Sequence, residues 1–116
     1  MTSDIVLEPA GDGIYVVRAA GELDLYTAPD LKAEILNAVE AGARGVVVDL
    51  TETTFIDSTA LGVLLRGVQR LRPRGGRLLV VCPDANITKI FHITGLDRVF
   101  PIYETRDAAL RQAALA

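Results

Sequence analysis

The sequence predicts an α/β protein: a mixed β-sheet opened by an N-terminal hairpin and continued by βαβ crossovers, in the order ββαβαβαβα. Three observations support this prediction. Two short β-type segments near the start flank a Gly-Asp-Gly turn, and two later runs are continuously apolar, as in parallel strands covered by helices. Segments with apolar residues at helical spacing lie between and after them. With 116 residues, we expect one domain, residues 1–116, able to bury its own core.

The first two strands are expected at residues 5–7 and 14–17. Between them stand Gly11, Asp12 and Gly13, residue types that adopt the positive φ angles a tight reversal requires. We therefore predict an antiparallel hairpin.

The next segment, GELDLYTAPDL (residues 21–31), leads into a helix. Thr27 and Asp30 have approximately the spacing of a capping box, and Pro29 is tolerated in a first helical turn because no intrahelical N–H is lost there. Gly42 is expected to end this helix.

The second half alternates strands and helices. Residues 46–50 and 78–81 are apolar runs expected to be buried strands. Between them, a helix carries the apolar stripe Leu61, Leu64, Leu65, Val68 and Leu71. A short helix at 85–93 ended by Gly95, a strand near 99–100 and a terminal helix at 107–115 complete the prediction.

Composition excludes several classes of protein. A net charge of −3 and a pI near 5.0 argue against nucleic acid as the main partner. The single cysteine, Cys82, rules out an internal disulfide and argues against a thiolate metal site, so we expect no metal and no cofactor. Neither an export signal nor an apolar run of about 18 residues is visible, which predicts a cytoplasmic protein with no membrane contact.

Polar residues follow two of the predicted strands. The carboxyl ends of parallel strands lie along one edge of an open sheet, and binding sites gather there. If the second and third strands are neighbours, that edge carries Glu22, Asp24, Asp57, Ser58 and Thr59. We call this set of residues the rim, and we expect the loop at 83–86 to lie on the same edge.

Ser58 has two possible roles from sequence alone. Asp57 is the expected N-cap of the helix that Ser58 begins, so the pair could be an ordinary cap. A phosphate on Ser58 is also compatible with a helix N-terminus and would add about −1.5 to −2 charges beside two aspartates. Facing a partner carboxylate about 6 Å away, that charge costs about 1–5 kcal/mol, enough to switch an association off.

GELDLYTAPDL, followed by VVVDLTETTFIDSTALGVL at residues 46–64, resembles the anti-sigma factor antagonists of the sulfate transporter and anti-sigma factor antagonist (STAS) domain family. The resemblance implies that an anti-sigma factor with serine kinase activity phosphorylates Ser58. It also implies that the unphosphorylated protein binds this kinase and so releases a sigma factor, that a serine phosphatase reverses the mark, and that Asp24 contributes to phosphorylation and partner contact. The expected partner surface is Asp24, Asp57, Ser58, Thr59 and Leu61.

Some details stay open at this stage. Ala60 stands where the family usually has a small residue, often glycine, and Thr59 is a possible alternate phosphate acceptor. Phe55 and Ile56 could either fill the core or offer an apolar anchor to the partner. The alternative function is a STAS scaffold that ignores phosphorylation, in a stress-signalling or transport-associated complex.

Enzymatic and nucleic-acid roles are less favoured. A phosphoaspartate receiver needs a lysine after its last parallel strand, and the segment after Phe100 lacks one. A hydrolase needs a base beside Ser58, but the only histidine, His92, is expected to face outward from a different helix. The arginines between residues 66 and 77 are interpreted as a solvated face, because no aromatic residues are interleaved with them.

Overall fold

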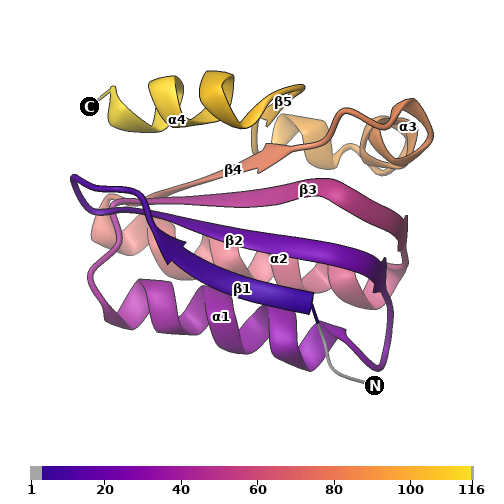
Figure 1. The fold of residues 1–116 in the computed structure, drawn as a ribbon, viewed down its shortest axis with the longest axis horizontal. Helices are drawn as coiled ribbons and strands as arrows, with labels where there is room; N and C mark the ends of the chain where they lie inside the picture. The colour runs from indigo at the N-terminus through magenta and orange to yellow at the C-terminus, as the bar shows by residue number, and fades with distance from the viewer. Residues whose placement is uncertain (1–3, 116) are drawn as a thin grey trace.

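The computed structural model describes residues 4–115, and it has the predicted order of elements (Figure 1). A five-stranded sheet has the order β1-β2-β3-β4-β5, with β1 antiparallel to β2 and all later pairs parallel. The elements are β1 (Asp4–Pro9), β2 (Ile14–Leu23), α1 (Ala28–Glu40), β3 (Gly45–Ile56), α2 (Ser58–Leu71), β4 (Arg77–Val81), α3 (Ala85–Thr94), β5 (Ile102–Tyr103) and α4 (Arg106–Ala114). The predicted α/β fold is confirmed.

Helices cover the two faces of the sheet unequally. Helices α1 and α2 lie together beneath it, while α4 lies above, over β3 and β4 (Figure 1). In β3, Val46 and Val48 face the α1–α2 core, and Val47 belongs to the smaller core under α4. Burial on both faces explains why this strand begins as a continuous apolar run.

The hairpin and its turn are as predicted. Gly11, Asp12 and Gly13 all have positive φ, at 86°, 56° and 76°. The prediction of the last strand is wrong: β5 lies at Ile102–Tyr103, and residues 96–98 form a 3-10 turn. The apolar residue Phe100 instead enters the core, where its ring meets Phe91 edge-on at 5.7 Å between centroids.

Two irregularities interrupt the β2–β3 ladder. Arg18 pairs with Asp49 and Ala20 with Glu52, so β3 has one residue more than β2 in this interval. A second extra residue lies between the partners of Gly21 and Glu22. Each bulge reverses the inward-outward alternation of β3, because the side-chain period of a strand is two.

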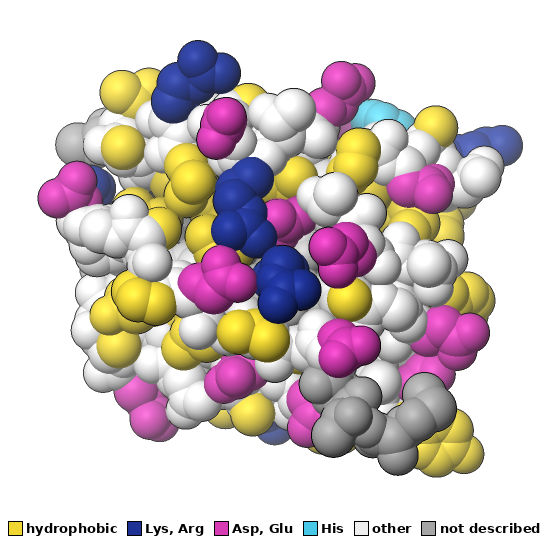
Figure 2. Space-filling model, in the orientation of Figure 1, with side chains coloured by type: hydrophobic (Ala, Val, Ile, Leu, Met, Phe, Trp, Pro, Cys, Tyr) yellow, Lys and Arg dark blue, Asp and Glu magenta, His cyan; other side chains and the backbone are white. Residues whose placement is uncertain are grey.

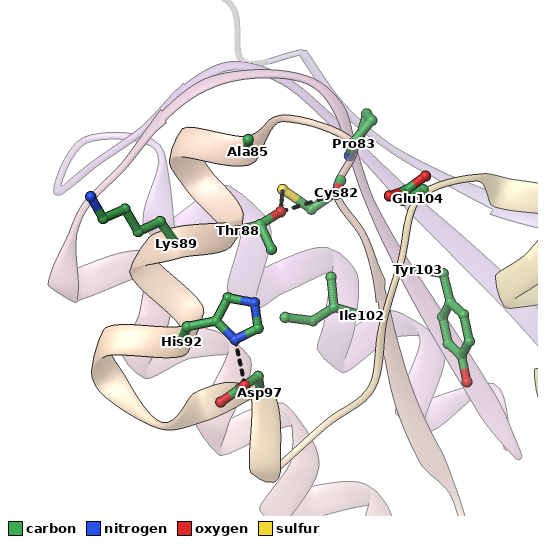
Figure 3. Close-up of a pocket in the computed structure, with 10 residues that line it drawn as sticks. All are labelled: Cys82, Pro83, Ala85, Thr88, Lys89, His92, Asp97, Ile102, Tyr103 and Glu104. Carbon is green, nitrogen blue, oxygen red and sulfur yellow. Dashed lines mark hydrogen bonds and ion pairs between the residues drawn. The ribbon is translucent and has the colours of Figure 1, made fainter.

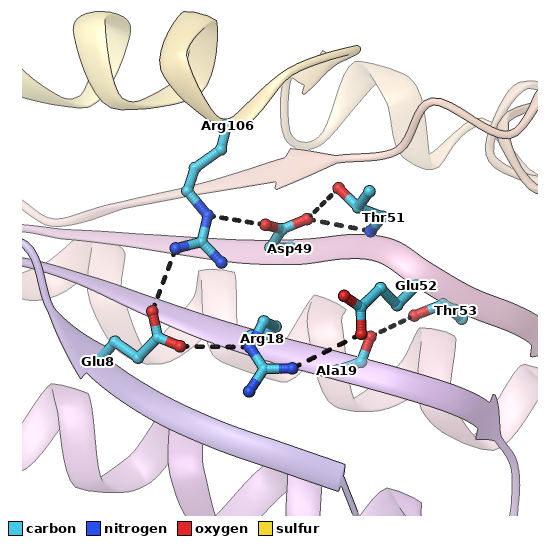
Figure 4. A network of polar contacts seen from close by, with 8 residues as sticks. All are labelled: Glu8, Arg18, Ala19, Asp49, Thr51, Glu52, Thr53 and Arg106. Atoms are coloured by element: carbon cyan, nitrogen blue, oxygen red, sulfur yellow. Dashed lines mark hydrogen bonds and ion pairs between the residues drawn. The ribbon is translucent and has the colours of Figure 1, made fainter.

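A polar network fixes α4 to the upper face of the sheet (Figure 4), and charged side chains of both signs gather on the face of the molecule shown in Figure 2. Arg106 donates from Nε to the buried Asp49 carboxylate at 2.8 Å and from a terminal nitrogen to Glu8 at 3.1 Å. Arg18 continues the network between Glu8 and Glu52. Burial raises the pKa of Asp49, but hydrogen bonds from Thr51 and Arg106 outweigh it and bring the pKa below its ordinary value.

This network predicts acid-sensitive stability. Asp49 has a lowered pKa, as does Glu8 through its hydrogen bonds from Arg18 and Arg106. Their contribution is complete above the unfolded pKa of about 4 and is lost as pH falls through the lower folded values. We expect Asp49→Asn to lower the free energy of unfolding by about 1–2 kcal/mol at pH 7, a value reduced because Arg106 is partly exposed.

Urea unfolding at a series of pH values from about 7 to 3 measures this effect. The wild type should lose stability more steeply below about pH 4 than Asp49→Asn. The control Asp12→Asn alters an exposed carboxylate in the hairpin turn that forms no ion pair within residues 4–115, and it should follow the wild type. Equal slopes for the wild type and Asp49→Asn would refute the assignment.

The two glycines inside α2 make a matched pair for a second prediction. A Cβ on Gly67 would lie 3.0 Å from Leu78 Cδ1 and 3.3 Å from Ile35 Cγ2, so this glycine permits close packing of α2 against the sheet and α1. The three atoms nearest to a Cβ on Gly62 all belong to Arg66, at 3.5 Å or more. Both changes to alanine gain similar helix propensity, so Gly67→Ala should be less stable than Gly62→Ala by about 1–3 kcal/mol. Equal urea midpoints would contradict this packing argument.

Candidate functional site

The rim forms where β2 and β3 extend beyond the end of β4. Leu23 pairs with Ile56 at the ends of the two strands, whereas β4 pairs only with residues 45–49 of β3. The Asp57 amide then donates to the Leu23 carbonyl at 3.0 Å. This hydrogen bond holds the start of α2 beside the β2–α1 loop, so Asp24 and Ser58 lie on the same edge of the sheet.

Asp57 is the N-cap of α2, as predicted, and its carboxylate accepts a hydrogen bond from the Ala60 amide at 3.1 Å. Ser58 is the first residue of the helix and is exposed. No residue in the described part of the chain forms a hydrogen bond with the Ser58 hydroxyl. The capping role therefore belongs to Asp57, and the Ser58 hydroxyl takes no part in it.

Asp24 organises the loop between β2 and α1. Its carboxylate accepts hydrogen bonds from the amides of Tyr26 at 2.9 Å and Thr27 at 3.1 Å. The Thr27 hydroxyl accepts from the Asp24 amide and donates to the Glu22 carbonyl. The capping box predicted for Thr27 and Asp30 is therefore wrong: Thr27 occupies the N-cap position, but its hydroxyl is engaged in the loop and forms no cap hydrogen bond.

Three large apolar side chains are exposed here. Tyr26 is 86% exposed, Leu25 63% and Phe55 49%. Phe55 pairs with Glu22 near the end of β2, so it lies next to the loop that carries Leu25 and Tyr26. Sequence analysis did not single out Leu25 or Tyr26, although two large apolar residues beside an acidic turn were a visible signal. We call Leu25, Tyr26 and Phe55 the apolar anchor.

The structure also resolves the ambiguity between Phe55 and Ile56. Ile56 is buried in the core that α2 covers, and Phe55 is exposed, because the second bulge restores the alternation of β3 that the first one shifts. Leu61, which we expected on the partner surface, is only 9% exposed because it packs in the same core. Its side chain therefore offers little area for direct contact. Thr59 is half-buried beside Ser58.

A separate cleft of about 600 Å³ opens between α3 and β5 (Figure 3). The loop at 83–86 follows β4 on the expected edge of the sheet and contributes Pro83 and Ala85 to the cleft lining. His92 is exposed, and its Nδ1 lies 2.6 Å from Asp97 Oδ2. The histidine thus pairs with Asp97 rather than with Ser58. Burial raises the pKa of Cys82, which lies at the base of this cleft and accepts a hydrogen bond from Thr88.

Within residues 4–115, no cluster of three or more His, Cys, Asp or Glu side chains is arranged to hold a metal ion. None of the helices in that range has the length and apolar character to cross a membrane.

Comparison with known proteins identifies the family. The STAS domain model matches residues 9–109. An anti-sigma-B factor antagonist from Staphylococcus aureus is 31% identical over 93 residues, which cover 80% of this chain and 86% of the relative.

Solved structures agree with this result. An anti-sigma factor antagonist from Mycobacterium paratuberculosis is 32% identical, with a TM-score of 0.81 over 97% of this chain and 94% of that one. The Bacillus cell fate determinant SpoIIAA in its phosphorylated form is 26% identical, with a TM-score of 0.73 over 93% of this chain and 97% of that one. The chain therefore belongs to the STAS domain family and resembles its anti-sigma factor antagonists.

Proposed function

We propose that this protein is an anti-sigma factor antagonist controlled by phosphorylation of Ser58. The unphosphorylated form binds an anti-sigma factor that is also a serine kinase, and this binding releases a sigma factor. In the modification step, the γ-phosphoryl group of ATP moves to the Ser58 oxygen, the hydroxyl proton is lost and ADP leaves. A serine phosphatase hydrolyses the phosphoester, which restores the hydroxyl and releases inorganic phosphate.

The observation that carries this proposal is the position of Ser58. Its hydroxyl is exposed, takes no part in capping α2 and lies beside the acidic loop of Asp24. A phosphate can therefore be added without removing a hydrogen bond from the fold. Because Asp24 and Asp57 are already present, a further −1.5 to −2 charges make the rim strongly repulsive to a partner carboxylate.

The apolar anchor supplies attraction to the same partner. Large exposed apolar side chains at a rigid surface are typical binding hot spots, and Tyr is among the enriched types. The Asp24 hydrogen bonds hold the loop that presents Leu25 and Tyr26. In this proposal Asp24 acts mainly by positioning the apolar anchor. The charge on Ser58 then determines whether the partner can bind to this anchor.

Two consequences follow for the class of protein. In this proposal the protein is a substrate of a kinase and not itself an enzyme, and His92, the one histidine of the sequence, pairs with Asp97 instead of acting as a base for Ser58. A role in sigma factor control also places the proposed site of action in the cytoplasm, with protein rather than nucleic acid as the direct partner.

The first prediction of this proposal concerns Ser58 itself. Ser58→Ala should bind the cognate anti-sigma kinase like the unphosphorylated wild type, while Ser58→Glu should bind at least about tenfold more weakly, a difference of about 1.4 kcal/mol. Calorimetric titration of each purified anti-sigma kinase from the source genome measures the affinity. Both variants should stay folded, since alanine and glutamate are tolerated in the first turn of a helix.

Equal affinity of the two variants for the kinase would contradict control by phosphorylation and favour a scaffold whose binding is insensitive to phosphorylation. Phosphopeptide mass spectrometry on protein from its own growing and stressed cells provides the second readout. A phosphate on Ser58 that changes with condition supports the switch. Phosphate found only on Thr59 would move the acceptor to the neighbouring residue.

A further prediction concerns the apolar anchor. Tyr26→Ala should weaken binding of the same kinase by about tenfold or more, because a well-placed aromatic anchor contributes about 2 kcal/mol. Stability should not change, since Tyr26 is largely in water. Leu115→Ala is the matched control, because this exposed leucine lies at the end of α4 far from the rim (Figure 1). If Tyr26→Ala binds as tightly as Leu115→Ala, the anchor is not part of the interface.

A further inference from the structure

We propose that Arg66 is the built-in partner of the phosphate on Ser58: its guanidinium lies along the Gly62 position of α2 and pairs with the phosphoryl group within the same chain. This inference rests on the proposed function for its biological use. It adds a residue that neither the sequence analysis nor the family assignment connects with the switch.

Gly62 provides the first argument. Glycine inside a helix costs about 1 kcal/mol relative to alanine, so its presence calls for a reason. Gly67 in the same helix has one, since a Cβ there would lie 3.0 Å from Leu78 and 3.3 Å from Ile35. Gly62 lacks such a reason: its φ is not positive, and the atoms nearest to a Cβ there belong to the far end of the Arg66 side chain, at 3.5 Å or more.

The position of the Arg66 side chain provides the second argument. Its two terminal nitrogens lie 3.5 and 3.6 Å from the point where a Cβ on Gly62 would stand. The side chain thus runs back along α2 toward the helix N-terminus, as helical side chains prefer. Within residues 4–115, Arg66 forms no ion pair, whereas Arg18 and Arg106 both do.

The spacing of residues along α2 places the Arg66 guanidinium within reach of a phosphate on Ser58. Ser58 and Gly62 are four residues apart, so their Cβ positions are about 5–6 Å apart on one side of α2. The Arg66 guanidinium already occupies the Gly62 end of this interval. A phosphoryl group extends the Ser58 side chain by a phosphorus and its oxygens and can turn toward Gly62. With no side chain at position 62, nothing separates the phosphate from the guanidinium.

The surrounding charges explain why such a partner is useful. Asp57 and Asp24 lie on the rim side of Ser58, and both repel a phosphate. On the other side, Arg66 lies in a shallow groove between α1 and α2 that Lys32 and Arg70 also line. A phosphate pulled toward α2 is therefore moved from acidic to basic surroundings. Arginine suits this task because its planar guanidinium matches phosphate oxygens in a bidentate arrangement.

The test uses the full chain with phosphoserine installed genetically at position 58. Phosphorus NMR follows the second ionisation of the phosphate, ordinarily near pH 6, at about 0.1 M salt. We expect a pKa in Arg66→Gln about 0.3–0.7 unit higher than in the phosphorylated protein with Arg66, because loss of the cation disfavours the dianion. Arg70→Gln is the matched control, since Arg70 lies in the same groove but about 18 Å along the axis from Ser58. It should titrate like the protein with both arginines.

Two results would overturn the proposal. One is an unchanged phosphate pKa in Arg66→Gln, and the other is an equal change in Arg70→Gln, which would indicate a diffuse basic surface instead of a specific pair. Neither depends on whether cells phosphorylate Ser58, because the phosphate is installed genetically. The phosphopeptide comparison above decides that separate question, so failure of the ion pair and failure of the proposed function can be told apart.

Discussion

The arrangement of the rim depends on the extension of β2 and β3 past the end of β4. The paired ends of these strands bring Leu23 and Ile56 side by side, and the hydrogen bond from the Asp57 amide to the Leu23 carbonyl joins the two loops that follow. Without this pairing, Asp24 and Ser58 would lie on separate connections, each free to move alone. The site therefore depends on the long parallel pairing of β2 and β3, and no single sequence motif contains all of its residues.

In the proposed function, the acidic groups of the rim act toward a partner as well as within the fold. Asp57 caps α2 and Asp24 ties down its own loop, so both carboxylates have fixed positions. Exposed apolar side chains attract a partner without a preferred direction, whereas the fixed negative charges beside them repel only nearby carboxylates of that partner. A phosphate added at Ser58 increases the electrostatic repulsion and leaves the apolar attraction unchanged. The fold can thus remain the same while affinity changes.

Local patterns predicted much of this structure. The Gly-Asp-Gly turn, the continuous apolar strands and the Asp57 cap are consequences of φ preferences, burial and hydrogen-bonding capacity over a few residues. Features that depend on distant partners were not predictable in this way. Arg106 and Asp49 are 57 residues apart and meet only because α4 crosses β3. The apolar character of Phe100 fits a buried strand, but it fits a core position outside a strand equally well, and the structure has the second arrangement.

The two bulges in β3 show why the site itself was harder to predict than the fold. Strict alternation from Val46, Val48 and Leu50 would bury every second residue to the end of the strand. The first extra residue shifts the phase, so Thr53 turns inward and donates to the Ala19 carbonyl (Figure 4). The second restores it, so Ile56 is buried and Phe55 is exposed. A bulge depends on the register of the neighbouring strand, which one segment of sequence does not specify. The irregularity that defeats the pattern also shifts the register of β3 against β2 and sets Phe55 opposite Glu22, so errors of prediction concentrate where the fold departs from regularity to build a surface.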